Sequence, residues 1–255
     1  MTNANYILRA EGINKSFGAV TAANDININI QSGEKVSLIG SNGAGKTTFM
    51  NMVTGYLKPD TGSIIFENKD ITQLNPRQIT QKGISRSFQI PQIFEPMTAW
   101  ENLLVALGTS KKNHSYFKSA KSQENADYID EILNRFALNE FAHRQVSELP
   151  GGVRKLLDIA MALVRKPKIL LLDEPTSGVG SEEKYPLMDT IAKALSGENL
   201  TVIFVEHDMD IVQNYSDRII AFYSGSVIAD GNSKEVLSDS KVQEYVTGKT
   251  KLKAN

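Results

Sequence analysis

The chain has 255 residues, of which 41% are hydrophobic, so it is long enough to bury a substantial core. Its 28 basic and 29 acidic residues leave a formal net charge of −1, without the basic excess of a nucleic-acid-binding domain, so no nucleic-acid partner is expected. Because it has no cysteine, it can form neither a disulfide framework nor a cysteine-ligated zinc site, and the cytoplasm is the expected compartment.

No stretch of the sequence is typical of a secretion signal or of a membrane-spanning helix. The first residues lack a basic region followed by an apolar core, and no window approaches the roughly 18 apolar residues that span a bilayer. We therefore expect a protein that is neither secreted nor membrane-spanning. That expectation still allows it to dock on a membrane protein.

The N-terminal part of the chain is predicted to be rich in β-structure. Residues 25–30 (DININI) alternate polar and apolar side chains, which is typical of a half-buried strand, and residues 6–13 (YILRAEGI) are a plausible sheet partner. Residues 35–40 (KVSLIG) are a short apolar run that ends in a glycine-rich turn, and a helix that stops at Gly55 is predicted after it. The pattern indicates a strand, a loop and a helix in succession.

Helical periodicity dominates the middle of the chain, from about Trp100 to Phe141. In part of this region the apolar side chains recur on one helical face, at Ala126, Ile129, Ile132, Leu133 and Phe136. We expect an inserted helical subdomain here.

Strands and helices alternate again in the C-terminal part of the chain. A helix over residues 152–164 is followed by a strand at 168–174 (KILLLDE), a helix at 182–195 and a strand at 201–207 (TVIFVEH), and residues 219–231 are predicted to form a hairpin. Buried apolar strands that alternate with helices indicate a parallel sheet covered on both faces. The predicted fold class is therefore α/β.

Residues 40–47 (GSNGAGKT) match the phosphate-loop pattern G-x-x-x-x-G-K-[ST], and they lie between a predicted strand and a predicted helix. The glycines allow backbone N–H groups to turn toward phosphate oxygens, and the helix N-terminus adds its positive dipole end. Lys46 would reach the β- and γ-phosphates, and Thr47 would ligate Mg²⁺. A fortuitous glycine-rich turn is the alternative. The predicted nucleotide-binding residues of this stretch are Asn42, Gly43, Ala44, Gly45, Lys46, Thr47 and Thr48.

Two carboxylates end the apolar run of residues 169–175 (ILLLDEP). Buried acids without a cation are costly, so a metal ion or a reacting water is the natural partner. Asp173 is placed to hold the Mg²⁺ shell, and Glu174 to orient and deprotonate an attacking water.

His207 closes the last predicted parallel strand and precedes Asp208. A lone histidine is more often structural than catalytic. At the end of a neighbouring parallel strand, however, it would face the crevice in which open α/β sheets bind ligands. We expect His207 to make a polar contact with a γ-phosphate.

The order of these motifs resembles that of the nucleotide-binding subunits of ABC transporters across nearly the whole chain. The phosphate loop, SFQ ending at Gln89, LPGGV, LLLDEP and VEHD follow the order and approximate spacing of that family. The resemblance implies a P-loop NTPase fold with an N-terminal antiparallel β subdomain. Its RecA-like core and β subdomain would take up about residues 1–95 and 165–240, its helical subdomain residues 96–164, and a C-terminal tail residues 241–255.

The resemblance also assigns roles to residues that have no motif of their own. Gln89 would sense Mg²⁺ and couple to the membrane subunit, although without the resemblance it reads as a surface amide. Phe17 would stack on adenine with Val20 beside it, because the π face of phenylalanine can do this as well as that of tyrosine. From the residues alone, Phe17 could equally belong to the core.

Members of this family act as dimers with ATP held between one subunit's phosphate loop and the other's signature segment. A homodimer or a heterodimer with a similar ATPase is therefore implied, with Gly151 and Gly152 offering backbone amides to the partner's nucleotide. Here Pro150 and Val153 replace the serine and glutamine of the common signature L-S-G-G-Q, and Gly180 stands where an acid or asparagine is usual. A serine hydroxyl on a phosphate is worth about 1.5–3 kcal/mol, and proline cannot supply it.

Several segments resemble the ATPases of branched-chain or hydrophobic amino acid importers and their urea and amide relatives, among them SRSFQIPQIFEPMTAWENLLVA and VEHDMDIV. Residues Ile93–Leu103 would line the groove that receives the transmembrane permease, because Ile93, Phe94, Met97 and Trp100 would form an exposed apolar patch. The alternative is that these side chains pack the subdomain. A solute-binding protein would be an indirect partner.

The predicted function is thus ATP hydrolysis at the cytoplasmic face of a membrane, powering the uptake of amino acids or related small polar solutes. Three alternatives stay open at this point. The same segments resemble the ATPase of lipopolysaccharide export, a soluble ABC-type ATPase could act without a transporter, and Pro150 with Gly180 would suit a poorly hydrolysing subunit of a heterodimer.

Overall fold

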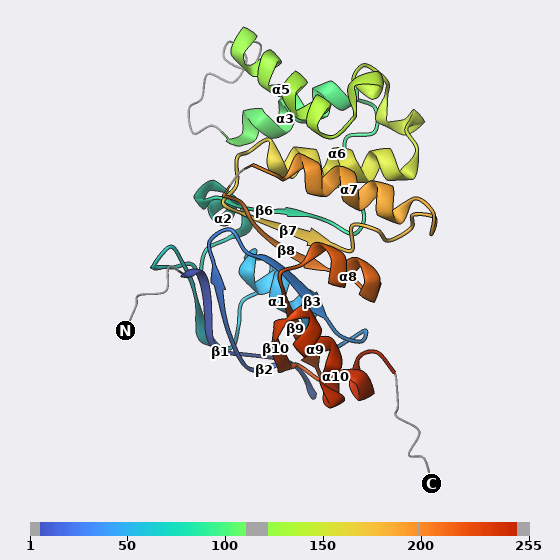
Figure 1. Ribbon diagram of the computed structural model, residues 1–255. Coiled ribbons are helices and arrows are strands. Elements are labelled where there is room, and N and C mark those ends of the chain that lie inside the picture. The colour runs from blue at the N-terminus through green and yellow to red at the C-terminus, as the bar shows by residue number, and fades with distance from the viewer. Residues whose placement is uncertain (1–5, 111–121, 198, 249–255) are drawn as a thin grey trace. The chain divides into compact units, whose positions relative to one another are not determined.

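The computed structural model describes residues 6–110, 122–197 and 199–248. These residues form two compact units, one from the described residues of 6–79 and 201–248 and the other from those of 80–200. Helix α2 (Pro76–Lys82) leads from the first stretch into the second unit (Figure 1).

An antiparallel sheet opens the first unit. Its strands are β1 (Tyr6–Phe17), β2 (Val20–Gln31), β4 (Thr61–Phe66) and β5 (Lys69–Asp70), in the spatial order β2-β1-β4-β5. Along β2 the buried residues Ile26, Ile28 and Ile30 alternate with exposed ones, so the predicted half-buried strand and its partner β1 are confirmed.

The first unit also contains parallel strands that are buried along their length. Strand β3 (Lys35–Ile39) pairs in parallel with β8 (Thr201–Val205) on one side and with β9 (Arg218–Tyr223) on the other, and β10 (Ser226–Asn232) pairs antiparallel to β9. The predicted hairpin at 219–231 is confirmed. Continuous burial of such strands is expected where helices cover a parallel sheet.

Short helices accompany these strands in the first unit. Helix α1 (Lys46–Val53) follows β3, α8 (Met209–Tyr215) follows β8, and α9 (Ser233–Ser238) and α10 (Ser240–Tyr245) follow β10. The side chains of Val212, Val236 and Val242 join Ile39, Ile219 and Ala221 in one buried cluster. Of the predicted C-terminal tail, residues 249–255 lie outside the described part of the chain.

The second unit combines one parallel strand pair with helices. Strands β6 (Ile84–Ser87) and β7 (Ile169–Asp173) pair in parallel with Ser87 opposite Leu172. The helices are α3 (Ala99–Ser110), α5 (Gln123–Arg135), α6 (Gly151–Leu163) and α7 (Lys184–Ala194), with the short 3-10 helices η1 (Asn139–Phe141) and η2 (Val146–Glu148). Residues 111–121 of the predicted helical subdomain lie outside the described residues.

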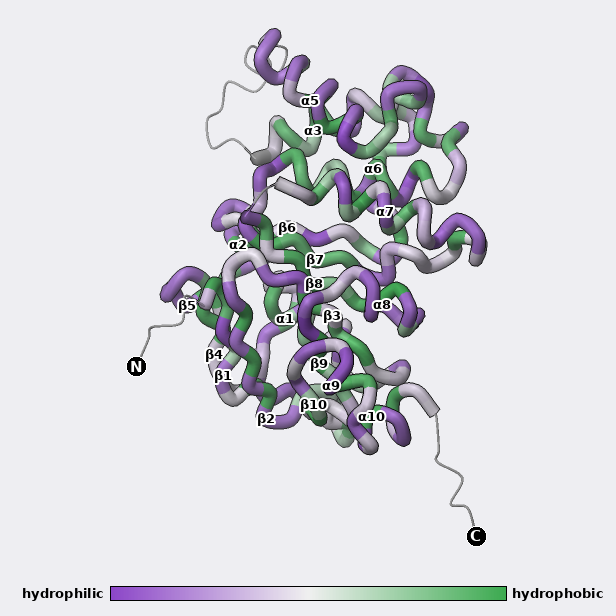
Figure 2. Tube along the Cα trace, viewed as in Figure 1, coloured by the Kyte–Doolittle hydropathy of each residue, from purple (hydrophilic) through white to green (hydrophobic). Residues whose placement is uncertain are grey.

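Apolar burial explains why these segments take the forms they do. Ile129, Ile132, Leu133 and Phe136 are at most 1% exposed, as the helical periodicity predicts, whereas Ala126 is half-buried. Strands β7 and β8 are mainly hydrophobic in Figure 2. Burying each such leucine, isoleucine or phenylalanine contributes about 1.5–3 kcal/mol. Within the described residues, no helix combines the length and apolarity that crossing a bilayer would require.

Candidate functional site

The loop of residues 40–47 connects β3 to α1, as the phosphate-loop pattern predicts. Gly45 is the N-cap residue of α1, with φ 109°, and a Cβ there would lie 2.6 Å from the carbonyl oxygen of Ala22. Only glycine fits this position without moving the backbone. Lys46 is 5% exposed, and its Nζ donates to the carbonyl oxygens of Gly40 (2.7 Å) and Ser41 (3.1 Å).

The same loop presents the polar end of α1 to solvent. Asn42, Gly43 and Thr47 are exposed, Thr48 is half-buried, and Ala44 is buried with its N–H donating to the carbonyl of Ser41 (3.1 Å). Since Gly45 has no side chain, nothing of its own covers the first N–H groups of the helix. An oxyanion could reach those amides, the helix dipole and the Lys46 ammonium together.

The turn between β9 and β10 is hydrogen-bonded to the phosphate loop. The N–H of Gly225 donates to the carbonyl of Ala44 (3.0 Å), and the carbonyl of Gly225 accepts from the N–H of Asn24 (2.8 Å). Sequence reasoning missed this contact, because Ser224 and Gly225 carry only a turn signal. The shape of the phosphate loop therefore depends on Gly225, which lies 181 positions after Ala44.

His207 lies where the predicted strand order requires. Since β8 pairs directly with β3, with Val205 opposite Leu38, the carboxyl ends of both strands meet at one edge of the sheet. His207 follows two residues after β8 and is exposed, and its backbone N–H donates to the side chain of Glu206 (3.2 Å). Its placement beside the strand that leads into the phosphate loop is confirmed, whereas its contact with a γ-phosphate stays a prediction.

Phe17 does not belong to the core. It faces Val20 across the turn between β1 and β2, and the two residues are 51% and 65% exposed. The Nζ of Lys15 lies 5.6 Å from the centroid of the Phe17 ring. An exposed aromatic ring near a cation is suited to stacking on a planar ligand. The contact of Phe17 with adenine stays a prediction.

In the second unit, the parallel pairing of β6 and β7 brings the predicted glutamine and carboxylates together. The Nε2 of Gln89 donates to Oε2 of Glu174 at 2.8 Å. Glu174 has φ 47°, which is uncommon for a residue with a side chain and typically costs about 1–3 kcal/mol. Backbone strain of this kind is typical of residues at catalytic and ligand-binding sites.

Asp173 has a partner that the sequence did not indicate. Its Oδ2 lies 2.5 Å from a guanidinium nitrogen of Arg86, and the two side chains are only 8% and 6% exposed. We expected a metal ion or a water to offset the buried charge, but Arg86 on β6 provides a protein cation. Among the described residues, no cluster of three or more histidine or acidic side chains could hold a metal by itself. Any Mg²⁺ would therefore depend on phosphate oxygens and water as well.

The segment of residues 148–155 contains the start of α6, which begins at Gly151 with Pro150 as its N-cap residue. A Cβ built on Gly151 or on Gly152 would meet no heavy atom within 4 Å among the described residues, so the surface there is open. Further along α6, Leu156 is half-buried, whereas Lys155 and Asp158 are buried.

The apolar segment after β6 is divided between surface and core. Ile90, Phe94 and Met97 are 75%, 49% and 38% exposed, and we call these three residues the apolar patch. Ile93 and Trp100 are half-buried, and the indole N–H of Trp100 donates to Asp130 (3.0 Å). The expectation of an exposed surface therefore holds for Phe94 and Met97, while Ile93 and Trp100 partly pack the unit.

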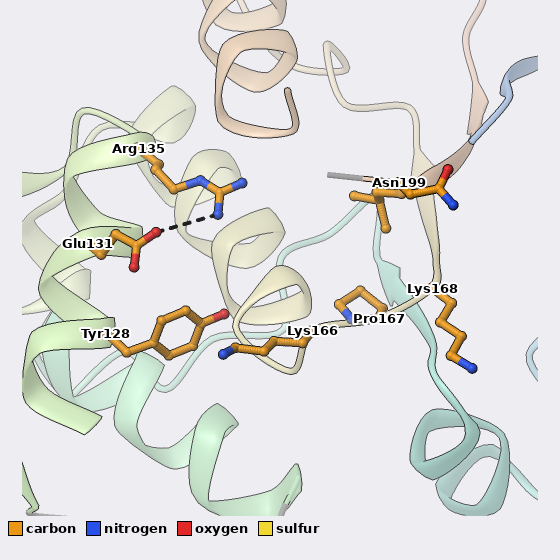
Figure 3. Close-up of a pocket in the computed structure, with 8 residues that line it drawn as sticks. Tyr128, Glu131, Arg135, Lys166, Pro167, Lys168 and Asn199 are labelled. Carbon is orange, nitrogen blue, oxygen red and sulfur yellow. Dashed lines mark ion pairs between the residues drawn. The ribbon is translucent and has the colours of Figure 1, made fainter. Parts of the chain in front are cut away.

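A separate hollow of about 340 Å³ lies at the amino end of β7 (Figure 3). Lys166 points toward the ring of Tyr128, with Nζ 4.3 Å from its centroid, and Arg135 pairs with Glu131 at 3.9 Å. Asp173 ends the strand at its opposite end, about 13 Å away at the usual rise per residue, and Glu174 follows it. This hollow is distinct from the carboxylate cluster. Its lining residues are Tyr128, Glu131, Arg135, Lys166, Pro167, Lys168, Asn199 and Leu200.

Comparison with known proteins decides the family. The family model for ABC transporters matches residues 23–177, a stretch that contains the phosphate loop, Gln89, the start of α6 and both carboxylates. The chain belongs to the ABC transporter family. This ABC ATPase is 38% identical to the probable branched-chain amino acid transport ATP-binding protein LivG of Methanocaldococcus jannaschii, over 95% of this chain and 97% of that protein.

Solved structures of the family agree with the fold. The ADP conformation of an ATP-binding cassette of an ABC transporter is 37% identical, with a TM-score of 0.81 over 94% of this chain and 97% of the other. A dimeric, post-hydrolysis cassette bound to ADP and Pi is 26% identical, with a TM-score of 0.76 over 89% and 98% of the two chains. The predicted P-loop ABC ATPase fold is confirmed, and the chain is a nucleotide-binding, ATP-hydrolysing transport ATPase.

Proposed function

We propose that this ABC ATPase energises the uptake of branched-chain amino acids from the cytoplasmic face of a membrane. The observation that carries the proposal is its 38% identity to a LivG protein along nearly the full length of both chains. Lipopolysaccharide export and a role without a transporter are the alternatives from sequence, and the LivG identity favours uptake over both.

In the proposed reaction, a water oxygen attacks the γ-phosphorus of ATP, the bond to the β–γ bridging oxygen breaks, and ADP leaves with that oxygen. Glu174 takes the proton of the attacking water, since its carboxylate is held by Gln89 at 2.8 Å. Lys46 and the loop amides of residues 42–48 bind the phosphates, and His207 contacts the γ-phosphate. Phe17 and Val20 hold the adenine through their exposed side chains.

Mg²⁺ would neutralise phosphate charge during this reaction. The residues that would hold it are Thr47, which is exposed in the first turn of α1, together with Gln89 and Asp173. Because Arg86 already pairs with Asp173, the carboxylate would be shared between the guanidinium and the ion.

The partners follow from two surfaces. We propose that the open amides at Gly151 and Gly152 face the nucleotide of a second ATPase subunit, identical or similar, because a related cassette is described as a dimer. We also propose that the apolar patch receives a segment of the transmembrane permease, with residues 96–164 as the helical subdomain that carries the contact. A solute-binding protein would act through the permease.

Uptake by the assembled transporter tests this function. The ATPase would be reconstituted in vesicles with the permease and solute-binding protein encoded beside it, and ATP turnover and uptake of labelled solute measured together. We expect stimulation by leucine, isoleucine and valine. Glutamate and urea serve as matched polar controls and should have no effect. Stimulation by urea alone, or by no solute, would contradict the proposed substrate.

Pro150 offers a test of the altered signature. Replacing Pro150 by serine should preserve or raise ATP turnover of the dimer, because serine provides an N-cap acceptor for α6, worth about 1 kcal/mol, and a hydroxyl for the partner's phosphate. Pro150→Ala removes the same ring but adds no hydroxyl, so the difference between the two variants isolates the hydroxyl. Steady-state phosphate release measures both. A large loss of turnover in Pro150→Ser would show that the proline itself is required.

A further inference from the structure

Two buried charges lie three residues apart on the inner face of α6. Lys155 is 3% exposed and Asp158 is 5% exposed. Residues spaced in this way on a helix lie on the same side, so both point into the second unit. Buried charges are destabilising unless hydrogen bonds and opposite charges compensate them. The hydrogen bonds of Lys155 and Asp158 therefore indicate which segment of the unit the pair holds in place.

Asp158 accepts hydrogen bonds from both sides of Gln89. Its Oδ2 accepts from the hydroxyl of Ser87 (2.6 Å) and from the N–H of Phe88 (3.0 Å), and its Oδ1 accepts from the N–H of Gln92 (2.9 Å). Burial raises the pKa of Asp158, although these hydrogen bonds and the charge of Lys155 oppose the rise. Both carboxylate oxygens are thus committed to the segment of residues 87–92.

Lys155 contacts the backbone carbonyl groups of the same segment. Its Nζ donates to the carbonyl oxygen of Gln89 and lies 3.4 Å from that of Phe88. Residues 88–98 belong to no helix or strand, so their backbone groups need partners outside regular structure. An apolar pair on α6 could pack as well, but it could bond neither these carbonyls nor these N–H groups. The two charges therefore fix the backbone on each side of Gln89 to α6.

We propose that Lys155 and Asp158 are positioning residues that hold Gln89 against Glu174, so that α6 sets the geometry of the hydrolytic carboxylate. The proposal rests on the proposed roles of Gln89 and Glu174 in ATP hydrolysis. It adds a connection within one subunit: the helix that offers Gly151 and Gly152 to the partner's nucleotide also holds this subunit's own Gln89. A displacement of α6 on dimer closure would then reach Glu174 without passing through the phosphate loop.

Asp158→Asn is the variant of choice, because it keeps size and shape but turns one acceptor oxygen into an amide that cannot accept an N–H. We expect kcat for ATP hydrolysis by the full chain to fall about tenfold with KM for ATP changed by less than about twofold. Amide hydrogen exchange at Phe88 and Gln92 should become faster. Leu133→Ala, which truncates a buried side chain of α5 in the same unit, is the control for general destabilisation, and it should lower Tm while leaving kcat of the folded protein unchanged.

A double-mutant cycle with Gln89→Ala distinguishes positioning from packing. If Asp158 acts through Gln89, Asp158→Asn should lower kcat in the wild-type background and have little further effect in the Gln89→Ala background. An equal loss in both backgrounds would overturn the proposal, as would faster exchange at Phe88 and Gln92 with unchanged kcat. If Gln89→Ala alone leaves turnover unchanged, the role proposed for Gln89 in ATP hydrolysis fails. If Gln89→Ala lowers turnover but Asp158→Asn does not, only the positioning role of Asp158 fails.

Discussion

Replacing Glu174 by glutamine should lower ATP turnover by about 10²- to 10⁴-fold, the usual contribution of a general base, while nucleotide binding persists. Glutamine has the same length as glutamate, and its carbonyl can still accept the hydrogen bond that Gln89 donates at 2.8 Å. What it loses is the ability to take a proton from water. Phosphate release would measure turnover, and titration with a fluorescent ATP analogue would measure affinity.

Glu182 provides the matched control for this substitution. It is an exposed glutamate in the loop that precedes α7, so Glu182→Gln makes the same chemical change away from the carboxylate cluster. Turnover in that control should equal wild type. Unchanged turnover in Glu174→Gln would mean that a different group accepts the proton, or that the working ATP site of the assembled transporter belongs to another subunit, as the heterodimer alternative holds.

Replacing Arg86 by methionine should destabilise the protein by about 3–5 kcal/mol, because it leaves the buried carboxylate of Asp173 without its ion pair. The two side chains are 6% and 8% exposed, so water cannot take over the role of the arginine. At the usual 2–4 °C per kcal/mol for a chain of this size, Tm should fall by about 6–20 °C. Thermal unfolding followed by circular dichroism measures the shift.

Two further variants make this expectation specific. Adding Asp173→Asn to Arg86→Met removes the stranded charge, so the double variant should recover much of the lost stability. Arg9→Met removes an arginine whose side chain is 35% exposed and pairs with Glu11 at 3.3 Å, and solvent-accessible pairs of that kind contribute at most about 1 kcal/mol. A fall in Tm for Arg86→Met no greater than that for Arg9→Met would show that the buried pair does not stabilise the unit.

The parts of the site that could be predicted from sequence are those encoded locally. The strand, loop and helix around Lys46 follow one another within 20 residues, and β7 carries its two carboxylates at its own end. The position of His207 also follows, because parallel strands align their carboxyl ends. For Phe17, periodicity could not separate core from surface, and only the 51% exposure excludes the core.

The parts that could not be predicted depend on contacts between distant segments. Asp158 meets its partners 66 to 71 positions away, and Arg86 meets Asp173 over 87 positions. Charged side chains on a helix or strand usually face solvent, so neither periodicity nor composition marks these as buried. Patterns of hydrophobicity locate elements, whereas pairing between buried charges becomes visible only in three dimensions.

The order of strands in the first unit has a consequence for synthesis on the ribosome. Strand β3, which leads into the phosphate loop, pairs with β8 and β9, whose paired residues are made 167 and 182 positions later. At a synthesis rate of about 5–20 residues per second, β3 would remain unpaired with β8 and β9 for roughly 10–35 s. A chain released before residue 223 lacks the last of β9, and the hydrogen bonds of Gly225 as well. We expect truncated translation products to be unable to retain nucleotide, so ATP binding reports that the C-terminal hairpin has been completed.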